Sequence, residues 1–181
     1  VSGSSIKQRT FDFPGGQPLR FTEVGASVSR NLVKPGNFYR DYVMIRLLGP
    51  LARSRLIALT NSSDLIIDVS GGDSFTSLYG TTRYNHTQIP KKMTLHLKKP
   101  LVLAPQTYGP FNERYREDAC NIIRHASLAW GRDQEAADFL ESIGVVPRWC
   151  PDIAFTLPAR SLTNPMPESC PVIGCNVSGL V

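Results

Sequence analysis

The 181 residues carry 20 Lys and Arg against 15 Asp and Glu, a formal net charge of +5, and 41% of them are hydrophobic. This composition is typical of a globular chain and excludes a disordered protein, a collagen and a small disulfide scaffold. The apolar runs are only a few residues long, so no membrane span is predicted. The four cysteines form no C-x-x-C pair, and we predict no metal site. We expect free thiols and a cytoplasmic protein.

The first third of the chain gives few strong signals. Residues 1–38 are rich in Gly, Ser, Pro and Asn and predict at most one strand, near 19–24. Apolar residues over 39–48 follow helical spacing, and a second helix is predicted over 51–59. A Gly-Pro pair between the two segments is expected to separate the helices.

Two short apolar runs predict strands, and a helix is expected between them. The run 64–69 is apolar through its length and predicts a strand buried on both faces. Pro90 suits the first turn of a helix that Pro100 ends. The segment 100–106 then predicts a second buried strand that runs into a Gly/Pro turn.

The clearest helix follows this second strand. Its predicted cap is Asn112, and its apolar face recurs at three- and four-residue intervals from Tyr115 to Ala126. A short strand is predicted at 128–131, and Asp133 is expected to cap a further helix that ends at Gly144.

Continuously apolar strands that alternate with helices are typical of a parallel sheet. We therefore expect an α/β fold, a Rossmann-like parallel sheet with helices on both faces. Residues 148–156 are expected to form a short strand or an ordered turn, 158–171 a proline-rich connector and 171–178 a final strand.

Polar residues follow three of the predicted strands at the point where each strand ends. The carboxyl ends of parallel strands share one edge of a sheet, where ligands bind in open α/β folds. Glycines at these ends allow a ligand to approach the backbone N–H groups closely. The candidate binding residues at these ends are Ser70, Gly71, Gly72, Asp73, Ser74, Gln106, Tyr108, Gly109 and Arg132.

Each of these segments also has a purely structural interpretation. The segments can be tight strand-to-helix turns, with Asp133 a helix cap and Asp73 a turn former. Arg132 can clamp a phosphate or carboxylate through two parallel hydrogen bonds, or it can form an ion pair with Asp133 or Asp73. Because the pattern recurs at three strand ends, we favour the binding interpretation.

Other ligand classes find little support in the sequence. The G-x-G-x-x-G, G-x-x-x-x-G-K-[ST] and G-x-S-x-G patterns do not occur, so no dinucleotide site, triphosphate site or nucleophile elbow is predicted. The densest basic cluster comprises Lys91, Lys92, Lys98 and Lys99. We interpret it as a solvated helix face and expect no nucleic-acid partner.

In content and order, the strand ends resemble the polysaccharide pyruvyl transferase family. The resemblance rests on DLIIDVSGGDSF, KPLVLAPQTYGPF, the R-D of LAWGRD, CPDIAFTLP and PVIGCNVSGL, and it extends from Asp64 to Val181. It implies one lobe of a two-lobed, GT-B-like architecture with the active site between the lobes. It also implies transfer of a pyruvyl group from phosphoenolpyruvate to a sugar of a cell-surface polysaccharide.

The resemblance assigns roles to the strand-end residues. Asp73 and Arg132 are the implied catalytic residues: Asp73 orients or deprotonates an acceptor hydroxyl, and Arg132 neutralises the phosphate or carboxylate of the donor. The implied substrate-binding residues are Ser70, Gly71, Gly72, Ser74, Gln106, Tyr108 and Gly109. No cofactor is expected, since phosphoenolpyruvate is a substrate.

The resemblance also predicts the organisation of the chain. We expect the N-terminal lobe over 1–160, and over 161–181 a connector and first strand that lead toward a second lobe not contained in the sequence. The family's first glycine-containing loop has no counterpart in residues 1–20. We therefore expect this chain alone to be incomplete as an enzyme, and to pair with a second lobe or to self-associate.

Two other functions remain open at this stage. The same architecture serves a lobe of a nucleotide-sugar-dependent glycosyltransferase, which would bind a nucleotide sugar and ignore phosphoenolpyruvate. A non-catalytic binding module that assembles with another chain is the second alternative.

Overall fold

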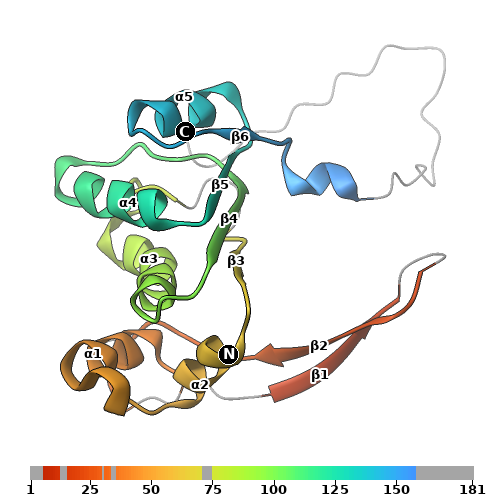
Figure 1. The fold of residues 1–181 in the computed structure, drawn as a ribbon, viewed down its shortest axis with the longest axis vertical. Coiled ribbons are helices and arrows are strands. Elements are labelled where there is room, and N and C mark those ends of the chain that lie inside the picture. Colours follow the sequence, from red (N-terminus) through yellow and green to blue (C-terminus); the bar gives the residue numbers. More distant parts are fainter. Residues whose placement is uncertain (1–5, 13–15, 30, 34–35, 71–74, 158–181) are drawn as a thin grey trace, which may run out of the picture.

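The computed structural model describes residues 6–12, 16–29, 31–33, 36–70 and 75–157. They form an α/β fold in which a four-stranded parallel sheet is flanked by helices, and a separate two-stranded hairpin extends from this body (Figure 1). The predicted domain boundary near 160 and the predicted final strand lie outside the described residues. None of the described helices combines the length and apolar character needed to cross a membrane.

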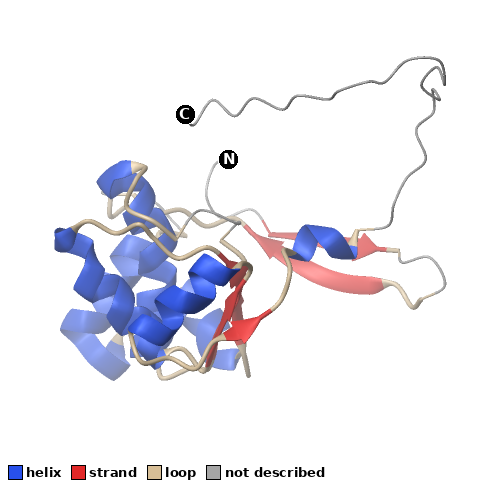
Figure 2. Ribbon diagram, turned by 90° about the horizontal axis from the view of Figure 1, so that it is seen from above, coloured by secondary structure: helices blue, strands red, loops and turns tan. Residues whose placement is uncertain are grey.

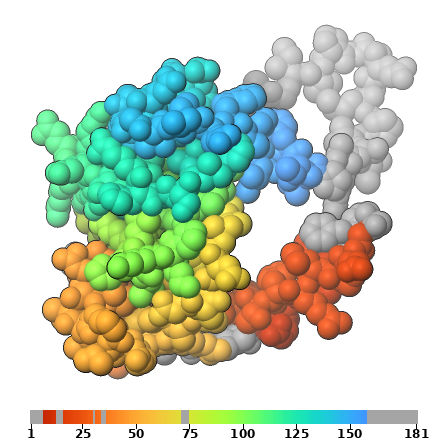
Figure 3. Space-filling model, in the orientation of Figure 1, coloured from red at the N-terminus to blue at the C-terminus, as the bar shows by residue number. Residues whose placement is uncertain are grey.

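The hairpin consists of β1 (Ile6–Phe11) and β2 (Leu19–Val24), which pair antiparallel. The predicted strand near 19–24 is thus confirmed, whereas β1 was not predicted. Arg9 forms an ion pair with Glu23 across the two strands, at 2.8 Å. The hairpin projects from the body (Figure 3), and its described side chains are mostly exposed.

Two helices precede the sheet and are set by their caps. α1 (Phe38–Leu48) begins where the side chain of Asn37 accepts the N–H of Tyr39, and α2 (Arg55–Ser62) begins where Ser54 accepts the N–H of Ile57. The segment Gly49–Leu51 forms one turn of 3₁₀ helix between them, as the Gly-Pro pair predicts.

The sheet contains β3 (Ile66–Asp68), β4 (Leu101–Gln106), β5 (Leu128–Gly131) and β6 (Arg148–Trp149) in that spatial order, all parallel. The connecting helices are α3 (Gly80–His96), α4 (Glu113–His125) and α5 (Gln134–Ser142). The predicted α/β class and Rossmann-like parallel sheet are confirmed.

The expected division of helices between both faces needs correction. Each described strand pairs with the next one along the chain, so the right-handed crossovers carry α3, α4 and α5 to the same face (Figure 2). On the opposite side lies a short 3₁₀ helix, Ile153–Thr156. β3 is an edge strand of this sheet, and Ile67 is 58% exposed, so the prediction that it is buried on both faces is wrong.

The start of α3 is also placed differently from the prediction. Pro90 lies inside the helix and not in its first turn, although a proline there removes one backbone hydrogen bond. Burial of Tyr84, Gln88 and Ile89 holds the helix across this position. Tertiary packing therefore outweighs the local signal for a helix start.

The main core fills the space between the sheet and its helices. Leu101 and Leu103 of β4 pack against Ile122 and Ile123 of α4 and Leu140 of α5. The apolar face predicted for the clearest helix is therefore the face that α4 buries. A second cluster joins α1, α2 and Met93 of α3.

We predict that Leu140→Ala lowers the free energy of unfolding by about 2–5 kcal/mol, because Leu140 is fully buried and its truncation leaves a cavity. Leu47→Ala is the matched control, since Leu47 is 77% exposed on α1 and should change that free energy by less than about 0.5 kcal/mol. Denaturant unfolding measures both. Equal effects of the two substitutions would contradict the assigned core.

Candidate functional site

A cavity of about 380 Å³ lies at the carboxyl ends of β3 and β4. Residues 68–70 and 104–106 form its walls on the sheet side, and residues of the segment 152–157, which includes the 3₁₀ helix, form the opposite wall. This is the edge of a parallel sheet where ligands usually bind. We call it the strand-end cleft.

A buried lysine supports the β3 side of the cleft. Lys91 of α3 is 1% exposed, and its ammonium lies 3.1 Å from an Asp68 carboxylate oxygen. It also donates to Ser70 Oγ at 2.8 Å and to the carbonyl of Thr87 at 2.7 Å. The Ser70 hydroxyl in turn donates to Asp68. The charges of Lys91 and Asp68 thus compensate each other beneath the cleft.

For Lys91, this position corrects the interpretation of the basic cluster as a solvated face, whereas Lys98 of the same cluster is exposed. Lys91 points into the molecule, and its ammonium lies 4.8 Å from the centre of the Phe75 ring. The spacing contained the signal, because Tyr84, Gln88 and Lys91 follow at four and three residues and so share one face of α3. Burial, which disfavours the charged form, lowers the pKa of Lys91.

Gln106 ends β4, at the strand end where it was predicted to lie, and it lines the cleft. It is 2% exposed, and neither its amide nitrogen nor its amide oxygen makes a hydrogen bond of good geometry to another described residue. Burial of an unsatisfied amide costs free energy unless a partner supplies the hydrogen bonds. Gln106 is therefore suited to recognise a polar ligand atom.

Arg132 follows β5 and is held by two neighbouring segments. Its Nε donates to Thr107 Oγ1 at 2.7 Å, and Nη1 donates to Asp152 Oδ2 at 3.0 Å. The predicted ion pair with Asp133 is longer, at 3.6 Å. Among the described residues, Nη2 has no hydrogen-bond partner. A guanidinium with five N–H groups thus keeps donors for an anion.

Asp152 connects Arg132 to the cleft, since it lines the cavity itself. Its carboxylate accepts the N–H of Ala154 at 2.9 Å and the Arg132 hydrogen bond. These two hydrogen bonds lower the pKa of Asp152 and keep it ionised. Asp152 was not predicted as a site residue, because no short-range pattern links it to an arginine 20 positions earlier.

Asp133 caps α5, as predicted, by accepting the N–H of Ala136 at 2.7 Å. Its other carboxylate oxygen accepts a hydrogen bond from Thr107 Oγ1 at 3.0 Å. Thr107 therefore joins the ends of β4 and β5, and both Arg132 and Asp133 contact it.

The side chain of Tyr108 is not part of the cleft. Tyr108 is 4% exposed, its ring packs near Phe75 and Phe139, and its hydroxyl donates to the carbonyl of Trp130 at 3.0 Å. Burial raises the pKa of this hydroxyl. Gly109, with a φ of +85°, turns the chain after β4.

The loop that follows β3 is tied to the loop that follows β4. Gly109 N donates to the carbonyl of Phe75 at 2.9 Å, and Thr76 Oγ1 donates to the carbonyl of Pro110 at 2.8 Å. Gly71, Gly72, Asp73 and Ser74 lie outside the described residues. The structure thus brings Ser70, Gln106 and, through Asp152, Arg132 to one edge.

A guanidinium and a buried amide thus lie at the carboxyl edge of a parallel sheet. We compared the whole sequence with known protein families. The family model for polysaccharide pyruvyl transferase matches residues 20–175. This chain belongs to the polysaccharide pyruvyl transferase family. The match includes every described residue of the strand-end cleft. No curated protein and no solved structure matches the chain.

We predict that Lys91→Met lowers the free energy of unfolding by about 3 kcal/mol, because it leaves the Asp68 carboxylate without its buried partner. The double variant Asp68→Asn/Lys91→Met should lose clearly less free energy of unfolding than the two single variants lose in sum. Denaturant unfolding of all four proteins gives the coupling free energy. Additive losses would show that the pair contributes no mutual stabilisation.

The lowered pKa of Lys91 also predicts a pH dependence of stability. The folded protein releases this proton at lower pH than the unfolded chain, so the unfolded chain binds more protons between the two pKa values. The free energy of unfolding of the wild type, minus that of Asp68→Asn/Lys91→Met, should therefore increase from about pH 8 to pH 10. A difference that stays constant or falls over this range would contradict the assignment.

Proposed function

We propose that this member of the polysaccharide pyruvyl transferase family takes its pyruvyl group from phosphoenolpyruvate and transfers it to a saccharide of a cell-surface polysaccharide. The observation that carries the proposal is the guanidinium of Arg132, which is fixed at the carboxyl end of β5 with Nη2 unused by the described residues. Its fork of N–H donors fits a phosphate or a carboxylate, and phosphoenolpyruvate carries both.

The atoms and bonds that change during ketal formation determine what the site must provide. Two acceptor hydroxyls form bonds to C2 of the donor, the C2–O bond to phosphate breaks, and inorganic phosphate leaves. One hydroxyl proton ends on the C3 methylene, which becomes a methyl group, and the other ends on phosphate. The transfer therefore needs positive charge at the leaving phosphate and a base near the acceptor hydroxyls.

The described residues supply part of this arrangement. Arg132 is proposed to hold the phosphate or the carboxylate of the donor, and Asp152 and Thr107 position its guanidinium. Gln106 is proposed to hydrogen-bond a polar atom of donor or acceptor from its buried position in the cleft. Because Arg132 is already held by two partners, it needs little reorganisation when substrate binds.

The proposal also gives a role to the glycine-rich segment after β3. Ser70, which precedes this segment, lines the cleft, and Phe75, which follows it, is tied to the loop after β4. This supports the proposal that Gly71, Gly72 and Ser74 contact substrate and that Asp73 orients or deprotonates an acceptor hydroxyl. Gly109 is proposed to shape the neighbouring loop.

We also propose that a second lobe closes the cleft from the side opposite these strand ends. In a GT-B-like arrangement the lobe over 1–160 would supply Arg132, and the second lobe would supply the proton for C3 and further cationic groups. The segment 161–181 would lead toward that lobe, and the reaction would take place in the cytoplasm. No cofactor is required by this chemistry, because the donor is itself activated.

Titration calorimetry of the chain with phosphoenolpyruvate tests the donor assignment. We expect saturable binding that Arg132→Ala weakens by about tenfold or more, and that Arg132→Lys restores only in part, because a lysine provides charge without the planar fork. The matched control is Arg116→Ala, which removes an exposed arginine of α4 that does not line the cleft.

Three results would argue against this function. Binding of phosphoenolpyruvate that Arg132→Ala leaves unchanged would remove Arg132 from the donor site. Saturable binding of a nucleotide sugar without a response to phosphoenolpyruvate would favour a glycosyltransferase. No release of phosphate from phosphoenolpyruvate with an oligosaccharide acceptor, tested with a protein that includes both lobes, would refute the transfer itself.

A further inference from the structure

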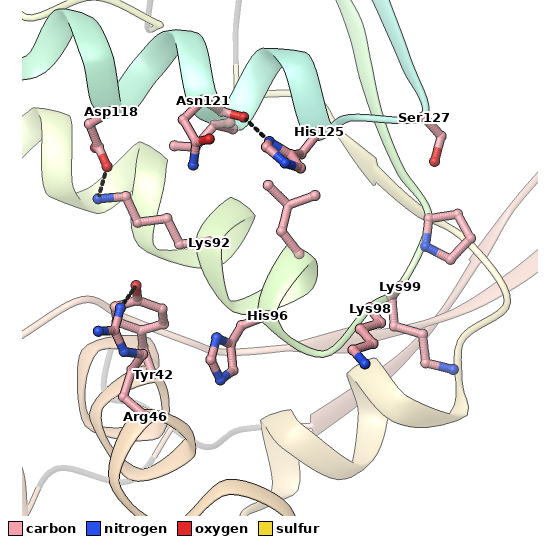
Figure 4. Close-up of a pocket in the computed structure, with 13 residues that line it drawn as sticks. Tyr42, Arg46, Lys92, His96, Lys98, Lys99, Asp118, Asn121, His125 and Ser127 are labelled. Carbon is pink, nitrogen blue, oxygen red and sulfur yellow. Dashed lines mark hydrogen bonds and ion pairs between the residues drawn. The ribbon is translucent and has the colours of Figure 1, made fainter.

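A second and larger cavity lies at the opposite edge of the sheet from the strand-end cleft. Its volume is about 680 Å³, and it is bounded by α1, α3, α4 and the residues that precede β4 and β5 (Figure 4). We call it the basic cavity. Its polar and charged lining residues are Tyr42, Arg46, Lys92, His96, Lys98, Lys99, Asp118, Asn121, His125 and Ser127.

The charges in this cavity are unbalanced. Lys92 forms an ion pair with Asp118 at 2.6 Å, so these two charges compensate each other. Within the part of the chain that the structure describes, Arg46, Lys98 and Lys99 are not paired with any carboxylate. Three positive charges therefore remain around one hollow, which favours a negatively charged ligand.

These cations come from different elements and surround the hollow. Figure 4 shows Arg46 and Tyr42 on one side and Lys98 and Lys99 on the other, with His96 between them. Arg46 is near the Tyr42 hydroxyl, at 3.4 Å, and so keeps its guanidinium at the rim of the cavity.

The backbone fixes the position of Lys98 in an unusual way. Lys98 has a φ of +56° at the end of α3, in the left-handed region where glycine is the usual residue. Its N–H donates to the carbonyl of Leu95 at 2.9 Å, and the N–H of Lys99 donates to that of Thr94 at 3.1 Å. Glycine at 98 would suit this backbone conformation better than lysine, although a positive charge at this end of α3 is favoured by the helix dipole.

The rest of the lining indicates what kind of anion fits. The rings of Tyr42 and His96 meet edge to face, with centroids 6.5 Å apart, and Asn121 and Ser127 add hydrogen-bonding groups. The volume is in the range of sites for organic ligands, about 300–1,000 Å³, and a single inorganic ion would leave most of it empty. Flat rings, polar groups and free cations together suit a sugar that carries a negative charge.

We propose that the basic cavity binds a carboxylate-bearing saccharide unit of the polysaccharide on which this protein acts. The proposal rests on the proposed function, because each pyruvyl transfer adds one carboxylate to the polymer. A segment that has already been modified would then be held in the basic cavity while another unit occupies the strand-end cleft.

The distance between the two sites agrees with binding of a polymer. The cleft lies at the carboxyl ends of the strands, and the basic cavity includes Pro100 and Ser127, which precede β4 and β5. The six residues of β4 span about 20 Å. A single sugar cannot reach both sites, whereas several linked sugars can.

Titration calorimetry with trigalacturonate, a trisaccharide that carries a carboxylate on each sugar, tests the proposal. We expect saturable binding to the wild type, weakened about fivefold by Lys98→Gly and about twentyfold by Arg46→Gln/Lys98→Gly. Lys98→Gly should keep or raise the melting temperature, since glycine suits a φ of +56°, so weaker binding in this variant is not a folding defect. Lys7→Ala, which removes an exposed lysine of the hairpin, is the control and should bind like the wild type.

Two further ligands identify the recognised chemistry. A neutral galactose trisaccharide and inorganic phosphate should each bind at least about tenfold more weakly than trigalacturonate. Equal binding of the neutral trisaccharide would overturn the role of charge, and equal binding of phosphate would overturn recognition of a saccharide. Absence of trigalacturonate binding, or binding that the double variant leaves unchanged, would overturn the site.

The same proteins separate this proposal from the proposed function. Arg132→Ala should weaken phosphoenolpyruvate binding and leave trigalacturonate binding unchanged. Lys98→Gly should weaken trigalacturonate binding and leave phosphoenolpyruvate binding unchanged. A wild type that binds trigalacturonate through Lys98 and does not bind phosphoenolpyruvate would retain the basic cavity and refute the donor assignment.

Discussion

Each strand of the described sheet pairs with the strand that follows it in the chain, and the positions of the connecting helices follow from this order. Because the crossovers share one hand, they deliver α3, α4 and α5 to the same face. The strands are parallel, so their polar ends collect at one edge and the loops that enter them collect at the other. The strand-end cleft and the basic cavity occupy these two edges.

The elements that the sequence predicts well are those whose signals are local. β4, α4 and β5 appear where apolar runs and helical spacing place them, and Asp133 caps α5 through an oxygen three residues from its donor. The family was predicted in the same way, from short segments in a fixed order, and the match over residues 20–175 confirms it.

The errors occur where distant contacts override local preference. Pro90 is a strong signal for a helix start, yet α3 runs through it because residues on either side are buried. Lys91 was grouped with exposed lysines, and only the fold reveals the carboxylate of Asp68 beside it, 23 positions earlier. The ion pair of Arg132 with Asp152 was missed for the same reason. The two residues are 20 positions apart, and the pairing of β6 with β5 brings them together.

The sheet itself carries a spectroscopic reporter near the carboxyl ends of its strands. The protein has two tryptophans, Trp130 in β5 and Trp149 in β6, on adjacent paired strands. Trp130 directly precedes the segment that carries Arg132, and Trp149 is 62% exposed. The tryptophan fluorescence of the molecule therefore comes only from β5 and β6, next to Arg132, and it senses that region without any added label.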